Sequence, residues 1–416
     1  MKRIAAALAL LLVATAAALA WLNLRGDPPA DAATAAPLDD AALRERGAYL
    51  ARAGNCQDCH TPRGGAPYSG GRGIPTPFGT VYSSNLTPDA ATGLGAWTAL
   101  DFRRALHNGR SRDGRLLYPA FPYDATTRIS DADADALWVY LRSLPAVAQP
   151  NRPHALRFPY DTQLALAVWR GLYFRPGRFQ PDAAQPAAWN RGAYLVQGLG
   201  HCAACHAERN ALGASRDPLG LAGGLMPLQH WLAPALGGGG ADPSRLATLL
   251  QHGVAEGAAL LGPMAEVALH STQHLQPEDL QAMAVYLQSL PPAAPAAAGR
   301  PPSAAQRAQG ETLYETHCAD CHGAQGQGVP GAYVPLAGNP GLLQDPPANP
   351  VQVVLGGAFA ASTAGNPRPF GMPPFATELS DEEVAAVLSY ARTAWGNQAG
   401  AVQALDVQRW RGSVRP

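Results

Sequence analysis

The chain repeats one pattern of apolar and polar positions three times, as two amphipathic segments separated by a long irregular stretch. The first segments read "RGAYLARAGNCQDCH" (46–60), "RGAYLVQGLGHCAACH" (191–206) and "AQGETLYETHCADCH" (308–322). The second segments read "SDADADALWVYLRSLP" (130–145), "QPEDLQAMAVYLQSLP" (276–291) and "LSDEEVAAVLSYARTAW" (379–395). In the second segments apolar residues recur every three or four positions, which predicts helices that each bury one face. The repetition indicates three copies of one structural unit.

Local signals agree with these helices. Ser130 and Ser380, each followed by acidic residues, are typical of a helix start. A glycine on each opening helix would let it cross close to a tyrosine of the closing helix, although these tyrosines also fit a plain role in the core. The three pairs are Gly47 with Tyr140, Gly192 with Tyr286, and Gly310 with Tyr390. The apolar stretch 164–174 ("LALAVWRGLYF") predicts a further short helix packed on the first two units.

The N-terminus has the features of an export signal. Lys2 and Arg3 precede an apolar run over residues 4–22, and Ala18-Leu19-Ala20 offers a small-x-small cleavage site. An uncleaved membrane anchor is the alternative, because the run approaches the roughly 20 residues that a span needs. Its richness in alanine favours cleavage. On either interpretation the basic end stays cytoplasmic and the rest of the chain crosses the membrane.

These patterns set the expected domain boundaries. We expect a mainly α-helical protein in which three tandem domains follow an N-terminal signal or anchor and are joined by Pro/Ala-rich linkers. The expected segments are a signal peptide or membrane anchor (1–24), a flexible leader (25–40), domain one (41–148), a connecting segment (149–184), domain two (185–291), a linker (292–303) and domain three (304–416).

The overall charge narrows the range of partners. Charged residues make up 15% of the chain and the net charge is zero, whereas an average domain has roughly 25% charged residues. A neutral chain of this kind gives no sign of a nucleic-acid partner or a polyanionic substrate.

All six cysteines fall in Cys-x-x-Cys pairs, and a histidine follows each pair directly. The three sets are Cys56, Cys59 and His60; Cys202, Cys205 and His206; and Cys318, Cys321 and His322. This is the motif of covalent c-type haem, in which two thiols bind the porphyrin vinyl groups and the imidazole binds the iron. Zinc sites, redox dithiols and plain disulfides compete, but none of them requires a histidine after every pair. The sequence therefore predicts three covalently bound haems c.

Five stretches carry a family resemblance. They are "NRGAYLVQGLGHCAACH" (190–206), "TPFGTVYSSNLTPDAATGLGAWTALDFRRAL" (76–106), "SRDGRLLYPAFPY" (111–123), "GAYVPLAGNP" (331–340) and "AWGNQAG" (394–400). From about residue 44 to its end, the chain resembles the three-haem cytochrome c subunits of membrane-bound bacterial dehydrogenases for alcohols, gluconate, sorbitol and related substrates. The resemblance implies three single-haem cytochrome c domains and a catalytic partner subunit that holds flavin or pyrroloquinoline quinone. It also implies electron transfer to ubiquinone or a terminal oxidase, in the periplasm at the outer face of the cytoplasmic membrane.

The resemblance further implies methionine as the second iron ligand, which transfers to Met264 and Met372. Met226 and Met283 also lie in domain two, but Met283 falls inside the closing helix and fits the core. Domain one has no methionine, and Phe121 stands where the family pattern Tyr-Pro-Ala-Met-Pro-Tyr has one. A phenyl ring cannot bind iron, so Phe121 marks a vacated axial position inside a preserved loop.

The first haem iron could then be five-coordinate, bind water or take a substitute ligand. His107 is the candidate substitute, although it ends a helix at a position that Gln251 occupies in domain two. A tyrosinate from Tyr118 or Tyr123 would need a strongly lowered pKa. We favour an open or weakly ligated first haem with a lower potential than the other two.

Two prolines are candidates for fixing the histidine rings. Pro335 would orient His322 through a backbone carbonyl, and Pro77 would do the same for His60. Both also fit plain turn prolines.

The sequence thus favours an electron-transfer subunit without a substrate site of its own. No Ser-His-Asp set, phosphate loop or carboxylate pair stands out, and the cofactor would supply the redox chemistry. The alternatives are a haem enzyme or small-ligand sensor that uses an open first haem, and a free-standing electron carrier.

Overall fold

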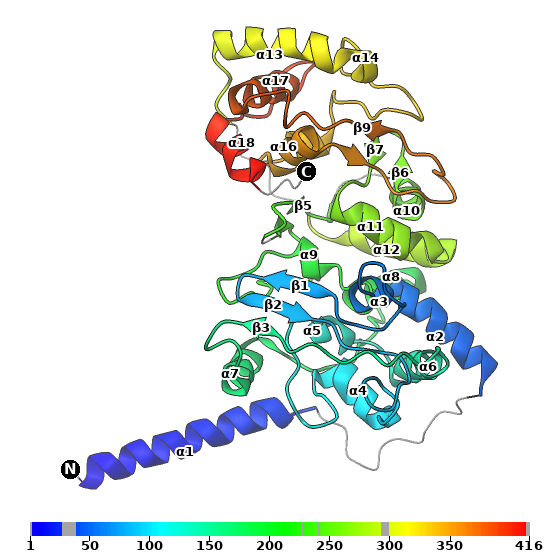
Figure 1. The fold of residues 1–416 in the computed structure, drawn as a ribbon, viewed down its shortest axis with the longest axis vertical. Coiled ribbons are helices and arrows are strands. Elements are labelled where there is room, and N and C mark those ends of the chain that lie inside the picture. The colour runs from blue at the N-terminus through cyan, green and yellow to red at the C-terminus, as the bar shows by residue number, and fades with distance from the viewer. Residues whose placement is uncertain (1, 27–38, 227, 239–241, 293–298, 413–416) are drawn as a thin grey trace. The chain divides into compact units, whose positions relative to one another are not determined.

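The chain is mainly helical and divides into two compact units (Figure 1). A computed structural model describes residues 2–26, 39–226, 228–238, 242–292 and 299–412. Unit one comprises Met1–Gln185, Tyr194–His201 and Asn210–Ala214, and unit two comprises Pro186–Ala193, Cys202–Arg209 and Ser215–Pro416. The expected mainly α-helical fold behind an N-terminal apolar helix is confirmed. Most of the expected leader (25–40) and half of the expected linker (292–303) lie outside the described residues.

Unit one contains the first repeat, the N-terminal helix and the connecting segment. Its helices are α1 (Lys2–Leu24), α2 (Ala41–Ala53), α3 (Cys56–His60), α4 (Ala99–Asn108), α5 (Tyr123–Thr126), α6 (Asp131–Arg142) and α7 (Gln163–Tyr173). Its strands are β1 (Gly73–Thr76), β2 (Gly79–Tyr82) and β3 (Ala155–Leu156), which form one antiparallel sheet in the order β1-β2-β3. Helix α8 (Ala187–Gln197) has residues in both units.

Unit two contains most of the second repeat and all of the third. Its helices are α9 (Ala203–His206), α10 (Pro243–His252), α11 (Pro263–His270), α12 (Pro277–Ser289), α13 (Ala304–His317), α14 (Ala319–His322), α15 (Pro340–Leu343), α16 (Ala348–Gly356), α17 (Asp381–Thr393) and α18 (Ala404–Arg411), with a 3₁₀ turn η1 (Thr272–His274). Its strands form two-residue antiparallel pairs: β4 (Gly224–Leu225) with β5 (Leu232–Ala233), β6 (Val254–Ala255) with β7 (Ala258–Ala259), and β8 (Ala358–Phe359) with β9 (Gly371–Met372).

The predicted crossing of opening and closing helices is confirmed in all three repeats. A β-carbon placed on Gly47 of α2 would lie 1.9 Å from the carbonyl oxygen of Ala136 in α6. A β-carbon on Gly192 would lie 1.9 Å from the carbonyl oxygen of Ala282, and one on Gly310 would lie 2.2 Å from that of Ala386. Each glycine also lies against the β-carbon of the expected tyrosine, Tyr140, Tyr286 or Tyr390. Only a residue without a side chain allows this approach.

The closing helices begin and pack as the sequence predicts. The hydroxyls of Ser130 and Ser380 accept hydrogen bonds from the backbone N–H groups three residues on. In the first repeat Leu50, Phe102 and Leu137 share one buried core cluster, which holds α2, α4 and α6 together. This core supports the loops that carry the cysteines.

Candidate functional site

Each Cys-x-x-Cys-His motif forms a short helical turn a few residues after an opening helix. The turns are α3, α9 and α14. In the second and third turns the first cysteine, Cys202 or Cys318, occupies the N-cap position, whereas Asn55 precedes the first turn in a left-handed conformation with φ of 47°. Residues three and four positions apart lie on the same face of a helix. Both thiols and the imidazole of each motif therefore share one face.

All three motif histidines make the same hydrogen bond. The Nδ1 atom lies 2.7 Å from the carbonyl oxygen of Ser84 for His60, 2.7 Å from that of Pro234 for His206, and 3.1 Å from that of Val334 for His322. A carbonyl only accepts, so Nδ1 carries the proton and the Nε2 lone pair remains available.

Burial lowers the pKa of all three rings, which favours the neutral imidazole. A neutral ring with its Nδ1–H fixed by a carbonyl is the usual form of an axial histidine ligand. The arrangement fits haem.

The carbonyl partners differ from those expected. The carbonyl of Pro77 accepts a hydrogen bond from Arg157, and Ser84 faces His60 instead, so the assignment of Pro77 is wrong. For His322 the partner is the carbonyl of Val334, one residue earlier than expected. The Pro335 carbonyl instead accepts from the side chain of Asn339 at 2.8 Å. The direction of a carbonyl depends on the local loop conformation, which a proline alone does not define.

The Ser84 carbonyl is held by residues that sequence reasoning missed. The next backbone N–H, that of Asn85, donates to Oδ1 of Asn151 at 2.7 Å. The buried Asn85 side chain donates to the carbonyl of Val147 at 2.8 Å. These bonds fix the peptide group between Ser84 and Asn85 and hence the carbonyl that faces His60. Ser84 and Asn85 lie in the stretch "SSNLTP" (83–88), which carries part of the family resemblance and could have indicated them.

The cysteines do not resemble those of a redox dithiol. Burial, followed by the neighbouring cysteine, raises the pKa of Cys56 and Cys202 to about 12 and that of Cys318 to about 11. Reactive dithiols instead have lowered thiol pKa values. Among the described residues no group of three His, Cys, Asp or Glu side chains is gathered as a bare metal ion would require.

Phe121 is half-buried in a tight turn of the first repeat. Its backbone N–H donates to the carbonyl of Tyr118 at 3.0 Å, and its carbonyl accepts from the N–H of Tyr123 at 2.8 Å. Its ring packs against the same core cluster as Cys56. Phe121 and a cysteine of the first motif are thus both neighbours of this cluster.

The two candidate methionine ligands lie in a helix and a strand, whereas Phe121 lies in a turn. Met264 is the second residue of α11, and Met372 ends strand β9; both are half-buried. Met283 is 4% exposed within α12, as expected of a core residue.

Burial shifts the pKa of each candidate substitute ligand in the first repeat. His107 is 1% exposed, and its Nδ1 lies 3.6 Å from a carboxylate oxygen of Asp131. Burial, followed by the charge of Arg178, lowers its pKa to about 3. Burial raises the pKa of Tyr118 to about 12 and also raises that of Tyr123. Both tyrosines therefore stay protonated near neutral pH, unlike a tyrosinate ligand.

Comparisons with known proteins agree with this site. The cytochrome c family model matches residues 44–145 and 307–395, which cover the first and third repeats. The chain is 37% identical to the cytochrome c subunit of a quinone-type alcohol dehydrogenase from Gluconacetobacter polyoxogenes, over 91% of this chain and 86% of the relative. It is 36% identical to the gluconate 2-dehydrogenase cytochrome c subunit of Pantoea cypripedii (89% and 90% covered) and 33% identical to the fructose dehydrogenase cytochrome subunit of Gluconobacter japonicus (94% and 87%).

Proposed function

Because the chain belongs to the family of cytochrome c subunits of bacterial alcohol, gluconate and fructose dehydrogenases, we propose that it relays electrons through three covalently bound haems c. One observation carries the number three. Each of the three motifs places two thiols and an imidazole on one face of a helical turn, with the imidazole Nδ1 bonded to a carbonyl. Haem c, when bound, supplies reversible one-electron chemistry at iron.

The chain's own residues attach and tune the cofactors. The cysteine pairs would hold the porphyrins, and His60, His206 and His322 would bind the irons. Met264 and Met372 are the proposed second ligands of the second and third haems. A thioether opposite histidine favours reduced iron and raises the potential.

The first haem is proposed to lack a strong second ligand. Phe121 occupies the corresponding loop and offers no donor atom. His107 takes the penultimate position of α4, which Gln251 holds in α10 of the second repeat, and Tyr118 and Tyr123 remain protonated. Without a donor atom at this position, the first site would leave room for water or an external small ligand, and a haem held there would have a lower potential than the other two.

The proposed donor is a catalytic dehydrogenase subunit with flavin or pyrroloquinoline quinone, and the proposed acceptor is ubiquinone or a terminal oxidase. The relatives are named as cytochrome subunits of dehydrogenases, one of them of the quinone type. Helix α1 is long and apolar enough to cross a membrane, which supports a periplasmic site at the outer face of the cytoplasmic membrane. Substrate oxidation would take place on the partner, and this chain has no substrate site of its own in the proposal.

Counting haems and electrons tests the relay. The purified holoprotein is expected to contain three haems per chain and to take up three electrons per chain in a reductive titration. The double substitution Cys202→Ala/Cys205→Ala should lower both counts to two. The reduced wild-type protein should bind about one carbon monoxide per chain. A wild-type count of two haems, or no loss in the second-repeat variant, contradicts the proposal.

A further inference from the structure

The last turns of α1 are bonded to the body of unit one through Asn23. The Oδ1 atom of buried Asn23 accepts a hydrogen bond from Nε of Arg170 at 3.0 Å, and its Nδ2 donates to the carbonyl of Ala167 at 3.0 Å. The Asn23 carbonyl accepts from Arg110 at 2.9 Å. Arg170 is 1% exposed, and a buried guanidinium without partners is strongly destabilising. The end of α1 is therefore part of the folded protein.

Cleavage after Ala20 would damage this joint. The side chains of Leu19 and Leu22 pack on Gly171 of α7, where a β-carbon would lie 3.4 Å from each, an ordinary van der Waals contact. The Leu19 carbonyl also accepts from Nδ2 of Asn23 at 2.9 Å. A cut after Ala20 removes Leu19 and places a charged amino group on Trp21, next to the buried asparagine. A signal peptide that is removed after export does not need these contacts with the folded protein.

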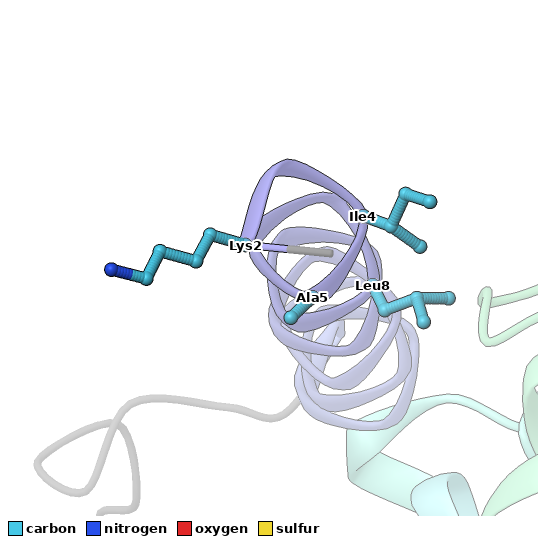
Figure 2. Close-up of a pocket in the computed structure, with 4 residues that line it drawn as sticks. All are labelled: Lys2, Ile4, Ala5 and Leu8. Atoms are coloured by element: carbon cyan, nitrogen blue, oxygen red, sulfur yellow. The ribbon is translucent and has the colours of Figure 1, made fainter.

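The rest of α1 has no contact of this kind. Its side chains from Lys2 to Ala18 are exposed, and Figure 2 shows Ile4 and Leu8 projecting from one side of its first turns and Lys2 from the other. At 1.5 Å per residue, the exposed residues Lys2–Ala18 extend about 26 Å and all 23 residues of α1 about 35 Å. To cross a hydrocarbon core of about 30 Å, α1 therefore needs its docked last turns to lie at the edge of the membrane. A bilayer would cover this otherwise exposed apolar surface.

Helix α7 continues the apolar surface at the end of α1. Leu164, Val168 and Leu172 follow at four-residue intervals and are 68%, 44% and 55% exposed. The opposite side of α7, with Leu166 and Arg170, is buried. The last turns of α1 contact α7 at Ala167, Arg170 and Gly171. The stripe therefore belongs to the helix that meets α1 where a spanning α1 would leave the membrane.

Aromatic and basic side chains mark the same level. Trp21 is 65% exposed, and Tyr173 at the end of α7 is 36% exposed. Tryptophan and tyrosine are enriched at the membrane–water interface. Arg25 and Arg175 lie side by side, because both donate to the carbonyl of Phe174, at 2.7 and 2.9 Å. Adjacent guanidinium groups suit the anionic phosphates of lipid headgroups.

We propose that α1 is retained as a membrane anchor and that the α7 stripe, Leu164–Val168–Leu172, lies in the headgroup layer of an anionic bilayer beside it. The amphipathic α7 then fixes unit one at the membrane surface, where α1 alone would act only as a tether. The occupant of the stripe is lipid.

Peptide mapping of the native holoprotein from isolated membranes tests the first part. Trypsin cuts after Arg3 and Arg25, so a retained anchor yields the peptide Ile4–Arg25. A peptide that instead begins at Trp21 overturns retention of α1.

Vesicle flotation tests the second part. Residues 2–18 are replaced by a cleavable export signal, which keeps Leu19 and Leu22 against α7, and the holoprotein is mixed with phosphatidylethanolamine–phosphatidylglycerol vesicles. We expect measurable binding that falls at least tenfold in Leu164→Gln/Val168→Gln/Leu172→Gln and does not change in Leu405→Gln, an equally exposed leucine on α18. An unchanged haem spectrum and thermal midpoint show that the triple variant is folded. Equal binding of the triple variant and its parent, or no binding by the parent, overturns the role of α7.

Discussion

The side-chain amide of Asn349 pairs with the backbone of Leu232 in both directions. Its Oδ1 accepts from the Leu232 N–H at 2.7 Å, and its Nδ2 donates to the Leu232 carbonyl at 2.8 Å. Leu232 belongs to the second repeat and Asn349 to the third. Leu232 also packs against the buried core cluster of the third repeat. The side-chain amide of Asn349 thus bonds the backbone of β5 as a neighbouring strand would, and it joins two repeats within unit two.

We predict that Asn349→Ala loosens this joint. The substitution leaves a backbone donor and acceptor of Leu232 without these partners, which costs about 1–3 kcal/mol for each buried group. Hydrogen exchange, followed by mass spectrometry, should accelerate at least fivefold in peptides that cover 224–233. The control is Asn339→Ala, whose lost bonds join residues within the third repeat. Equal protection of 224–233 in both variants contradicts the prediction.

The helix crossing gives a second prediction. In Gly47→Ala the new β-carbon meets the Ala136 carbonyl, so α2 and α6 must separate, at a cost of about 1–3 kcal/mol or more. Exchange should then accelerate roughly tenfold in peptides that cover 41–53 and 131–142. Gly177→Ala is the matched control, because a β-carbon at Gly177 meets nothing within 4 Å. Unchanged exchange in Gly47→Ala would contradict the prediction and show that the two helices can separate at little cost.

Phe121→Met should convert the first haem to a six-coordinate site. The new thioether is expected to raise the lowest of the three midpoint potentials, because it favours reduced iron. Carbon monoxide binding should fall from about one per chain to none. Phe102→Met alters another phenylalanine of the same core and should leave both values unchanged. If Phe121→Met retains full carbon monoxide binding, Phe121 does not stand at the axial position.

The methionine ligands have a complementary test. Met264→Leu and Met372→Leu nearly conserve volume, so each should preserve the fold while opening one iron. Carbon monoxide binding should rise from about one to about two per chain in either variant. Met283→Leu, in the buried part of α12, should leave it at about one. A variant at Met264 that behaves like the Met283 control would direct the search for the second ligand to Met226.

Buried His107 predicts a specific dependence of stability on pH. Its pKa is about 3 in the folded protein, mainly because of burial, and about 6.5 when unfolded. As pH falls from 6.5 towards 3, the unfolded chain binds a proton that the folded chain does not, so the free energy of unfolding decreases. Above pH 6.5 the effect is absent.

Between pH 7.5 and 4.5 this loss amounts to roughly 2–3 kcal/mol. His107→Gln should therefore lose less stability than the wild type over that interval in urea unfolding. The haem spectrum at neutral pH should stay the same, because the proposal gives His107 no iron to bind. A spectral change on substitution would support His107 as the substitute ligand.

The sequence predicted those parts of the fold that depend on local spacing. The three motifs, the closing helices, the glycine crossings and the short helix in the connecting segment follow from periodicity and residue size, and the structure has each of them. Trp169 of that short helix, α7, donates to the carbonyl of Leu212 at 2.9 Å, in agreement with the expected contact to the second repeat.

The parts that could not be predicted depend on contacts between distant residues. Pro77 was expected beside His60, but the carbonyl there belongs to Ser84, whose direction is set by Asn85 and Asn151. Asn23 lies 147 residues from Arg170, and nothing in the apolar pattern of α1 indicates that its last turn is docked. Such pairings need the folded backbone, because neither residue carries a local signal for the other.

The carbonyls that hold the three motif histidines lie at very different distances along the chain. They follow the histidine by 24, 28 and 12 residues. The intervening loop can therefore gain or lose more than a dozen residues while the ligand keeps its anchor. For protein engineering, this loop is the natural place to insert a tag, a reporter or a new docking sequence next to a redox centre without rebuilding the centre itself.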